Sequence, residues 1–164
     1  MGKPSSPVDL SGTHLPVLSR LINATSGSVL ELGAGRNSTP LLYWTCKAEK
    51  RFFRSYENDQ KWADAMGDMT EYAGDWDSLP VFEMRWSIVL IDHRPALRRH
   101  VDALKFANIA DYVVMHDSEP EIDRFYKYSR IYNKFKYVYQ YTKIKPNTAI
   151  LSNFSDPKLI FDLT

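Results

Sequence analysis

The sequence predicts a doubly wound α/β fold, in which a mostly parallel, Rossmann-like sheet lies between helices and ends in an antiparallel hairpin. Short apolar runs alternate with helical stretches along the chain, which is typical of parallel βαβ units with right-handed crossovers. The last two apolar runs are separated by too few residues for a crossover, so they must pair as an antiparallel hairpin. A length of 164 residues fits one domain with a sizeable core.

The N-terminal part is expected to be a flexible leader followed by that single domain. The first residues are rich in proline and serine, so we predict a leader over residues 1–12 and a domain over residues 13–164. Thr13 can cap a helix whose apolar residues recur at helical spacing. This helix is expected to end between residues 23 and 27.

Strands and helices are expected to alternate after this helix. Short apolar runs predict strands, whereas apolar residues three or four positions apart predict helices. The expected strands lie at residues 28–32, 51–56, 85–91 and 111–116, with a shorter one within 70–84. The expected helices lie at residues 38–47, 59–69, 95–107 and 121–131. The hairpin is expected to use residues 134–143 and 148–154.

The charge and cysteine content exclude several classes of protein. Lys and Arg total 21 and Asp and Glu total 20, so the net charge of +1 produces no overall field that favours nucleic acid or membranes. The single cysteine, Cys46, cannot form an internal disulfide. The start of the chain has no signal-peptide pattern, and no apolar run approaches the ~18 residues of a membrane span. We therefore expect a cytoplasmic protein without a membrane partner.

A glycine loop follows the first expected strand. Gly33 and Gly35 allow the backbone to turn sharply and to approach a ligand closely. Ser38 stands where a dinucleotide-binding loop has its third glycine, which argues against a dinucleotide. Glu57 ends the second expected strand, where a carboxylate can accept both hydroxyls of a ribose. The alternative is that the glycines only form a turn and that Glu57 only leads into a helix.

These features resemble the class I S-adenosylmethionine-dependent methyltransferases. The resemblance rests on Glu31-x-Gly33-x-Gly35, on Glu57, on Asp92 after the fourth strand and on the terminal hairpin, and it covers about residues 28–154. It implies that the glycine loop lies near the methionyl end of the cofactor and that Glu57 binds its ribose. It also implies an acidic residue facing the adenine after the third strand, where Asp75 is the candidate and Trp76 would supply an apolar face. The implied cofactor-binding residues are Glu31, Gly33, Ala34, Gly35, Ser38, Thr39, Glu57, Asp75, Trp76 and Asp92.

Two further strands end in paired polar residues. Asp92-His93 and His116-Asp117 are expected side by side at the carboxyl edge of the sheet, where a methyl acceptor should lie. Asp92 and Asp117 suit Mg²⁺, which prefers carboxylates and water as ligands. A network of histidine and carboxylate groups without a metal is the alternative. In a purely structural interpretation, the aspartates cap the following helices and the histidines bind loop carbonyls.

The same strand end is similar to that of metal-dependent O-methyltransferases of the catechol type. Leu90-Ile91-Asp92-His93 resembles their metal-bearing strand end, and Asp117 resembles their second metal carboxylate. Their lysine base is missing here, so a histidine would have to accept the proton of the acceptor hydroxyl. We expect the catalytic residues to be His93 as the base, His116 as the second choice for the base, and Asp92.

The region from Arg124 to Lys145 contains seven basic residues and no acidic one. Alternating tyrosines at 137, 139 and 141 predict a sheet face packed on a helix, or else a surface that binds nucleic acid or sugar. The segment Asp92-His93-Arg94-Pro95 lacks the Asn/Asp-Pro-Pro-Tyr/Phe sequence typical of methyltransferases that act on exocyclic amines. We therefore expect O-methylation of a small molecule or glycan and disfavour nucleic acid.

Two other functions stay open at this point. One is an RNA or protein methyltransferase that uses the basic, tyrosine-rich segment, and the other is a noncatalytic S-adenosylmethionine-binding subunit. The core has almost no insertion that could form a lid over the substrate. A neighbouring copy in a homo-oligomer, or His14 and Leu15 of the first helix, would then close the pocket.

Overall fold

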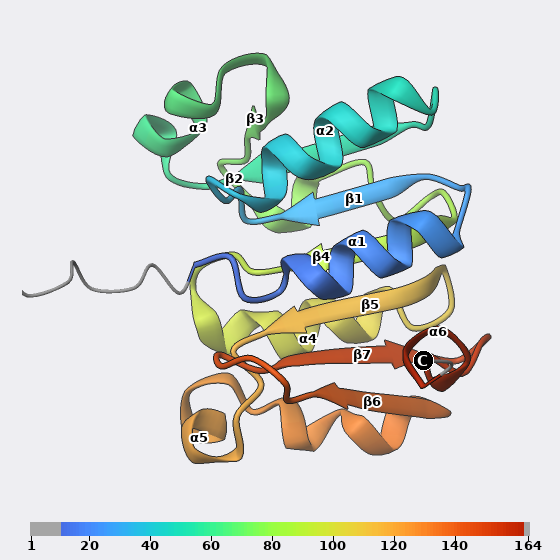
Figure 1. The fold of residues 1–164 in the computed structure, drawn as a ribbon. Coiled ribbons are helices and arrows are strands. Elements are labelled where there is room, and N and C mark those ends of the chain that lie inside the picture. The colour runs from blue at the N-terminus through green and yellow to red at the C-terminus, as the bar shows by residue number, and fades with distance from the viewer. Residues whose placement is uncertain (1–10, 163–164) are drawn as a thin grey trace, which may run out of the picture.

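The computed structural model describes residues 11–162, which form one seven-stranded sheet with helices on both faces (Figure 1). The strands are β1 (Val29–Leu32), β2 (Phe53–Glu57), β3 (Glu71–Tyr72), β4 (Trp86–Ile91), β5 (Ala110–His116), β6 (Tyr137–Tyr141) and β7 (Thr148–Ser152). Their order in the sheet is β3-β2-β1-β4-β5-β7-β6. Strands β1 to β5 pair in parallel, whereas β7 is antiparallel to both β5 and β6. The predicted sheet with its antiparallel hairpin is therefore confirmed.

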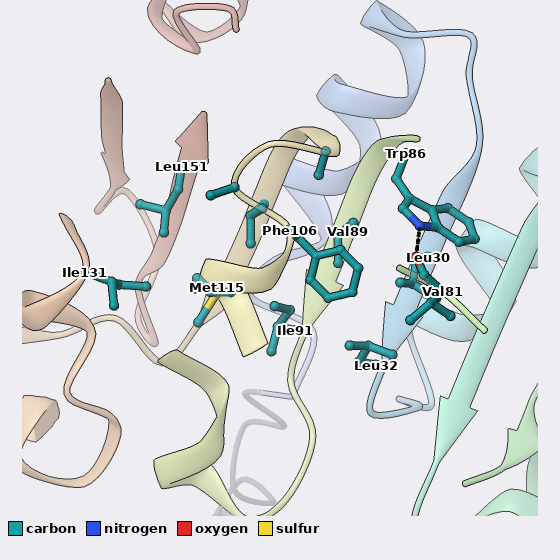
Figure 2. Close-up of a cluster of buried hydrophobic side chains, with 14 of the residues drawn as sticks. Leu30, Leu32, Val81, Trp86, Val89, Ile91, Phe106, Met115, Ile131 and Leu151 are labelled. Carbon is teal, nitrogen blue, oxygen red and sulfur yellow. Dashed lines mark hydrogen bonds between the residues drawn. The ribbon is translucent and has the colours of Figure 1, made fainter. Parts of the chain in front are cut away.

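Successive residues of the central strands point into two apolar cores, one on each face of the sheet. The helices are α1 (Leu15–Ala24), α2 (Ser38–Ala48), α3 (Gln60–Met66), α4 (Arg99–Lys105), α5 (Asp123–Tyr126) and α6 (Lys158–Phe161). Ile88 and Leu90 pack with residues of α1, α2 and α6, whereas Val89 and Ile91 pack on the side of α4. Figure 2 shows this second core, in which the indole of Trp86 donates a hydrogen bond to the carbonyl of Val81 at 2.8 Å.

The first and the last segments differ from their predicted form. Residues 1–10 of the expected leader lie outside the described residues, and Ser11 and Gly12 form a turn that enters α1. Thr13 does not cap α1, because its hydroxyl donates to the carbonyl of Pro146 at 3.0 Å. The tyrosines of β6 follow the packing interpretation, since Tyr139 stacks on Phe161 of α6 at 5.1 Å between ring centroids.

Two predicted helices are broken in the structure. The helix expected from Pro95 starts only at Arg99, after extended backbone at Pro95 and a 3-10 turn. The helix expected over residues 121–131 ends at Tyr126, because Lys127 adopts a left-handed conformation with φ of 57°. Asp123 stabilises this break by accepting hydrogen bonds from the amide and the hydroxyl of Ser129 at 3.0 and 2.6 Å. No helix in the described part of the chain is long and apolar enough to cross a membrane.

Candidate cofactor and acceptor site

Two cavities lie next to each other at the edge where the parallel strands end. Figure 1 shows this edge of the sheet on the left. The smaller one, of about 330 Å³, is lined by Ala34, Glu57, Asp59, Trp62, Asp92 and Arg94. The larger one, of about 450 Å³, shares Ala34, Trp62 and Asp92 with it. It extends to the start of α1 and the end of β5, where its lining includes His14, Gly35, Arg36, His116 and Asp117. We call these two spaces the edge cavities.

The glycine loop crosses directly over the end of β4. Gly33 has a φ of +95°, and a Cβ atom there would overlap the backbone of Asp92 and His93. Glycine at this position therefore allows two segments of backbone to approach each other, and this contact, more than space for a ligand, demands it. The loop continues into α2, where the amide of Gly35 donates to the hydroxyl of Thr39 at 2.9 Å. Ser38 and Thr39 are both buried and line neither edge cavity.

Glu31 lies behind this loop and is completely buried. Its Oε2 accepts hydrogen bonds from the hydroxyls of Thr39 and Ser55 at 2.7 and 2.6 Å, whereas its Oε1 has no hydrogen-bond partner among the described residues. Burial raises the pKa of the Glu31 carboxyl to about 7, against the opposing effect of its hydroxyl donors. Glu31 lines neither cavity, so the structure places it as a support for the glycine loop.

Glu57 lies at the end of β2, where the sequence predicts a ribose-binding acid. Its Oε2 accepts a hydrogen bond from the amide of Ala34 at 3.0 Å, and its Oε1 accepts one from the amide of Asp59 at 2.8 Å. These bonds connect the second strand to the glycine loop and orient the carboxylate beside the smaller cavity. Each carboxylate oxygen has a further lone pair that can accept another donor.

The aromatic side chain of the cavities is Trp62 in α3, which sequence reasoning missed. Its indole donates to the carbonyl of Ala34 at 2.7 Å, and the guanidinium of Arg36 lies 5.1 Å from its ring centroid. Arg94 and Asp59 also line the smaller cavity without having been predicted. The available signal was the position of Trp62 in the first turn of the helix after β2, because that turn must face the glycine loop.

Asp75 and Trp76 are not where the predicted adenine contact requires them. Asp75 is exposed, and its carboxylate accepts a hydrogen bond from the amide of Asp77 at 3.0 Å, which caps a 3-10 turn. Trp76 is buried, and its indole donates to the carbonyl of Arg94 at 3.0 Å. Neither residue lines an edge cavity. Trp76 instead packs under the surface and holds the loop after β4 through its hydrogen bond to Arg94.

His93 also points into the interior, which corrects its assignment as a base facing the acceptor. Its side chain has an exposed fraction of 0%. The ring stacks on Trp76 at 4.5 Å between centroids, and Nε2 lies 2.9 Å from Oδ2 of Asp102 in α4. Because side chains alternate between the faces of a strand and its continuation, Asp92 faces the cavities and His93 faces the core. The imidazole therefore holds α4 against the strand end.

Asp92 and Asp117 do lie together, but a guanidinium occupies the position between them. Arg99 Nη1 lies 2.8 Å from Oδ1 of Asp92 and 3.2 Å from Oδ2 of Asp117. Other nitrogens of Arg99 donate to the carbonyls of His93 and Asp92 at 2.7 and 2.8 Å. The predicted Mg²⁺ site between Asp92 and Asp117 is therefore not supported. Sequence reasoning treated Arg99 only as part of a helix.

The pKa of the Asp92 carboxyl is shifted in the opposite direction to that of Glu31. Burial opposes its ionisation, but the hydrogen bond with His116 and the charge of Arg99 outweigh burial, so the pKa of Asp92 is lowered. Asp117 has a positive φ of 58°, and its Oδ2 also accepts a hydrogen bond from the hydroxyl of Tyr126 at 2.9 Å. Both aspartates line the larger cavity, and each is held by donors from other elements.

His116 is held between the hydroxyl of Thr13 and the two aspartates. Thr13 Oγ1 donates its only proton to the carbonyl of Pro146, so it must accept a hydrogen bond from Nε2 of His116 at 2.9 Å. Nδ1 of His116 lies 3.4 Å from Oδ2 of Asp92 and 3.7 Å from Oδ1 of Asp117. Burial would lower the pKa of His116, but these carboxylates raise it above its usual value. With Nε2 donating to Thr13, the remaining ring nitrogen Nδ1 faces the carboxylates of Asp92 and Asp117. The role of His116 as a base stays a prediction.

His14 is the other histidine at the larger cavity, where the sequence predicts a lid residue. Its ring centroid lies 4.5 Å from that of His116, with the rings edge to face. Burial, together with the nearby His116, lowers the pKa of His14 to about 4, so the imidazole is neutral at pH 7. Leu15, the second residue expected to close the pocket, does not line the larger cavity.

Comparisons with known proteins identify the fold. Neither a protein-family model nor a curated protein sequence matches the chain. Among solved structures, human methyltransferase 10 domain containing protein matches with a TM-score of 0.56 and 11% identity over 93% of this chain and 86% of that chain. The N-terminal domain of human METTL16 in complex with SAH matches with a TM-score of 0.54 and 13% identity, covering 94% and 73%. The hMettl16 catalytic domain in complex with MAT2A 3′UTR hairpin 1 matches with a TM-score of 0.58 and 11% identity, covering 94% and 72%.

These similarities confirm the class I methyltransferase fold, whereas the resemblance to catechol-type enzymes is not confirmed. They also overturn the sequence-based preference for a small-molecule or glycan acceptor, because a structure similar over 94% of this chain contains an RNA hairpin. The sequence argument relied on the missing Asn/Asp-Pro-Pro-Tyr/Phe sequence at residues 92–95. That absence bears on which atom accepts the methyl group and does not decide whether the acceptor molecule is RNA.

Proposed function

We propose that this chain is an S-adenosylmethionine-dependent methyltransferase whose acceptor is RNA. The observation that carries the proposal is the placement of the glycine loop and Glu57 beside the smaller edge cavity in a class I methyltransferase fold. S-adenosylmethionine would supply a methyl group on a sulfonium that is already activated. The protein then has to bind and orient the two substrates and to provide a place for one proton.

The residues around the cavities fit this cofactor. Glu57 presents carboxylate oxygens that can accept ribose hydroxyls, and Trp62 offers an aromatic face within the same cavity. Arg36 follows the glycine loop and lines the larger cavity, where it can pair with the carboxylate of the methionyl group. We infer that Asp92, which lines both cavities, lies where the two substrates meet.

The surface around this edge fits an RNA strand. The turn between β6 and β7 lies at the same edge, because Thr148 pairs with His116, and it carries the exposed side chains of Lys143 and Lys145. Helix α5 lies beside this turn (Figure 1), and it carries the exposed side chains of Arg124 and Phe125, with 51% of Phe125 accessible. Cations that contact phosphates, with aromatic rings on which bases stack, are typical of single-stranded RNA surfaces.

We further infer that the acceptor atom is a hydroxyl oxygen of the RNA. The segment Asp92-His93-Arg94-Pro95 lacks the sequence typical of enzymes that methylate exocyclic amines. In the transfer, a bond forms between the acceptor oxygen and the methyl carbon while the bond from sulfur to that carbon breaks. The hydroxyl proton then leaves to the ionised carboxylate of Asp92 or to water.

Cofactor binding is tested by calorimetry with S-adenosylmethionine and SAH. Glu57→Ala is expected to weaken binding by about 1–3 kcal/mol, or roughly 5- to 150-fold, because two ribose hydroxyls lose a charged acceptor. Glu83→Ala is the matched control, since Glu83 is exposed and lines neither edge cavity. Equal affinities in the two variants, with unchanged melting temperatures, would remove the cofactor assignment.

The acceptor is tested by transfer of a radiolabelled methyl group to total RNA, followed by digestion to nucleosides. Lys143→Glu/Lys145→Glu is expected to reduce RNA affinity about tenfold or more and to lower its salt dependence. Lys47→Glu/Lys158→Glu is the control, because these exposed lysines lie near the opposite edge. Binding of SAH without label in RNA would contradict the proposal and favour a noncatalytic cofactor-binding subunit. Label on a base amine would correct the acceptor atom.

A further inference from the structure

Three side chains that could bind a metal ion converge beside the larger edge cavity from three different elements. His14 immediately precedes α1, Asp92 follows β4, and His116 ends β5. One ligand atom of each lies within 4.8 Å of the others. Asp117, which the sequence predicts as a metal ligand, does not belong to this group. The sequence predicts no metal-binding role for His14.

His14 has the properties expected of a ligand that lacks its ion. Only 1% of its surface is exposed, and neither ring nitrogen has a hydrogen-bond partner within the part of the chain that the structure describes. A buried imidazole without a partner has lost its hydrogen bonds to water and gained none from the protein, which is unfavourable. Because the ring also lines the larger cavity, its nitrogens are placed beside Asp92 and His116 with no protein group to bind.

The distance between the other two ligands fits a metal ion better than a strong hydrogen bond. Nδ1 of His116 lies 3.4 Å from Oδ2 of Asp92, whereas a charge-assisted hydrogen bond is about 2.7–2.9 Å long. Bonds of about 2.0–2.1 Å to a tetrahedral ion place two ligand atoms about 3.3–3.4 Å apart. The observed separation is the one that a bound ion requires.

The surrounding residues already orient both ligands. The hydroxyl of Thr13 accepts a hydrogen bond from Nε2 of His116, which directs Nδ1 toward Asp92. Arg99 holds Oδ1 of Asp92 at 2.8 Å and leaves Oδ2 on the side of the histidines. Outer hydrogen bonds of this kind fix the tautomer of a metal-binding histidine and the orientation of a metal-binding carboxylate.

We propose that His14, Asp92 and His116 form a binding site for a first-row transition-metal ion of the Zn²⁺ type. Two imidazoles and one carboxylate suit Zn²⁺ or Co²⁺, whereas Mg²⁺ prefers oxygen ligands. The fourth position of such an ion faces the larger edge cavity, where a water molecule or a substrate oxygen can bind. The site needs neither S-adenosylmethionine nor RNA, so it stands or falls independently of the proposed function.

The site is tested by titrating the full chain, freed of metal with a chelator, with ZnCl₂, CoCl₂ and MgCl₂. We expect one Zn²⁺ per chain by calorimetry, a visible absorption band of tetrahedral Co²⁺, and no comparable binding of Mg²⁺. His14→Gln, Asp92→Asn and His116→Gln are each expected to weaken Zn²⁺ binding by about 100-fold or more. Thr13→Val, which removes the outer hydrogen bond to His116 together with the one to the carbonyl of Pro146, is expected to weaken Zn²⁺ binding by about 10- to 100-fold. His100→Gln is the control, because His100 is not part of the cluster.

Two results would overturn the proposal. One is the absence of stoichiometric Zn²⁺ binding to the wild-type chain, and the other is equal affinity in His14→Gln and His100→Gln. If a ligand variant fails to fold, X-ray absorption of the Zn²⁺-loaded wild-type chain shows how many imidazoles bind the ion. Scattering from two imidazoles supports the site, whereas a spectrum with at most one imidazole contradicts it.

Discussion

The carboxyl edge of the sheet has two halves, and each holds its carboxylates with a different kind of partner. At the end of β1 and β2, Glu31 and Glu57 are held by hydroxyls and backbone amides, which carry no net charge. At the end of β4 and β5, Asp92 and Asp117 are held by the guanidinium of Arg99 and the imidazole of His116. Burial raises the pKa of Glu31, whereas at Asp92 the hydrogen bond with His116 and the charge of Arg99 together outweigh burial and lower the pKa.

An acidic residue at this edge therefore responds differently to substitution in each half, because its partners are neutral in one half and charged in the other. The neutral donors of the first half include a near one, Thr39, which is eight residues from Glu31, and distant ones, such as Ser55, which is 24 residues from it. The ionic network joins residues that are distant in sequence, such as Thr13 and His116. Variants that exchange neutral and charged partners should therefore affect the two halves with different magnitudes and with opposite dependence on pH.

The largest effect is expected from removing the central cation. Arg99→Met should lower the free energy of unfolding by about 3–5 kcal/mol, because two largely buried carboxylates lose their common partner. Arg85→Met is the control, and it should cost less than about 1 kcal/mol, since Arg85 and its partner Asp111 form a surface ion pair. Urea unfolding at pH 7 measures both. Similar losses in the two variants would mean that the network contributes no more than a surface salt bridge.

A second, smaller effect is expected where the two halves touch. Gly33→Ala should cost about 2–3 kcal/mol, because the new Cβ combines an unfavourable φ with overlap on the backbone of Asp92 and His93. Gly67→Ala should cost only about 1–2 kcal/mol, since Gly67 also has a positive φ but no atom within 4 Å of the new Cβ. Denaturant unfolding of both proteins checks this ranking. An equal cost would show that backbone conformation alone explains the glycine.

The smallest effect, and the sharpest comparison, is a difference in the pH dependence of stability. The folded-state pKa of Glu31 is raised to about 7, so its proton stabilises the fold at acidic pH, and this contribution is lost as pH rises from about 4.5 to 7. Glu31→Gln should remove the stability loss caused by ionisation of Glu31, and it should be more stable than the wild type at pH 8 by about 1–2 kcal/mol.

The pKa of Asp92 is lowered in the folded state, so the stability that the ionised carboxylate contributes is present above its unfolded pKa and is lost at more acidic pH. Asp92→Asn should therefore destabilise the chain at pH 7 by about 1 kcal/mol.

Urea unfolding at pH 5 and pH 8 distinguishes these two cases. The stability of Glu31→Gln relative to the wild type should increase from pH 5 to pH 8. Asp92→Asn should be less stable than the wild type at both pH values. Parallel pH curves for the two variants would show that the charges of Arg99 and His116 do not separate the two halves.

Much of the fold and one half of the site could be predicted from the sequence. The strands, their alternation with helices, the glycine turn and the acid at Glu57 all depend on patterns within a few residues, so each could be inferred locally. The break after Tyr126 could not be inferred, because it depends on the left-handed conformation of Lys127 and on the hydrogen bonds of Asp123.

The sequence by itself determined which strands end in polar residues, because period-two alternation and turn residues are properties of short segments. Only the tertiary structure decided which of those side chains face the cavities. In the folded chain, His93 contacts Trp76 and Asp102. Arg99 lies between two aspartates, and the ring of His14 packs on that of His116. These contacts join residues from different elements, and their energies depend on burial and on charges that meet only when the sheet and its helices have assembled.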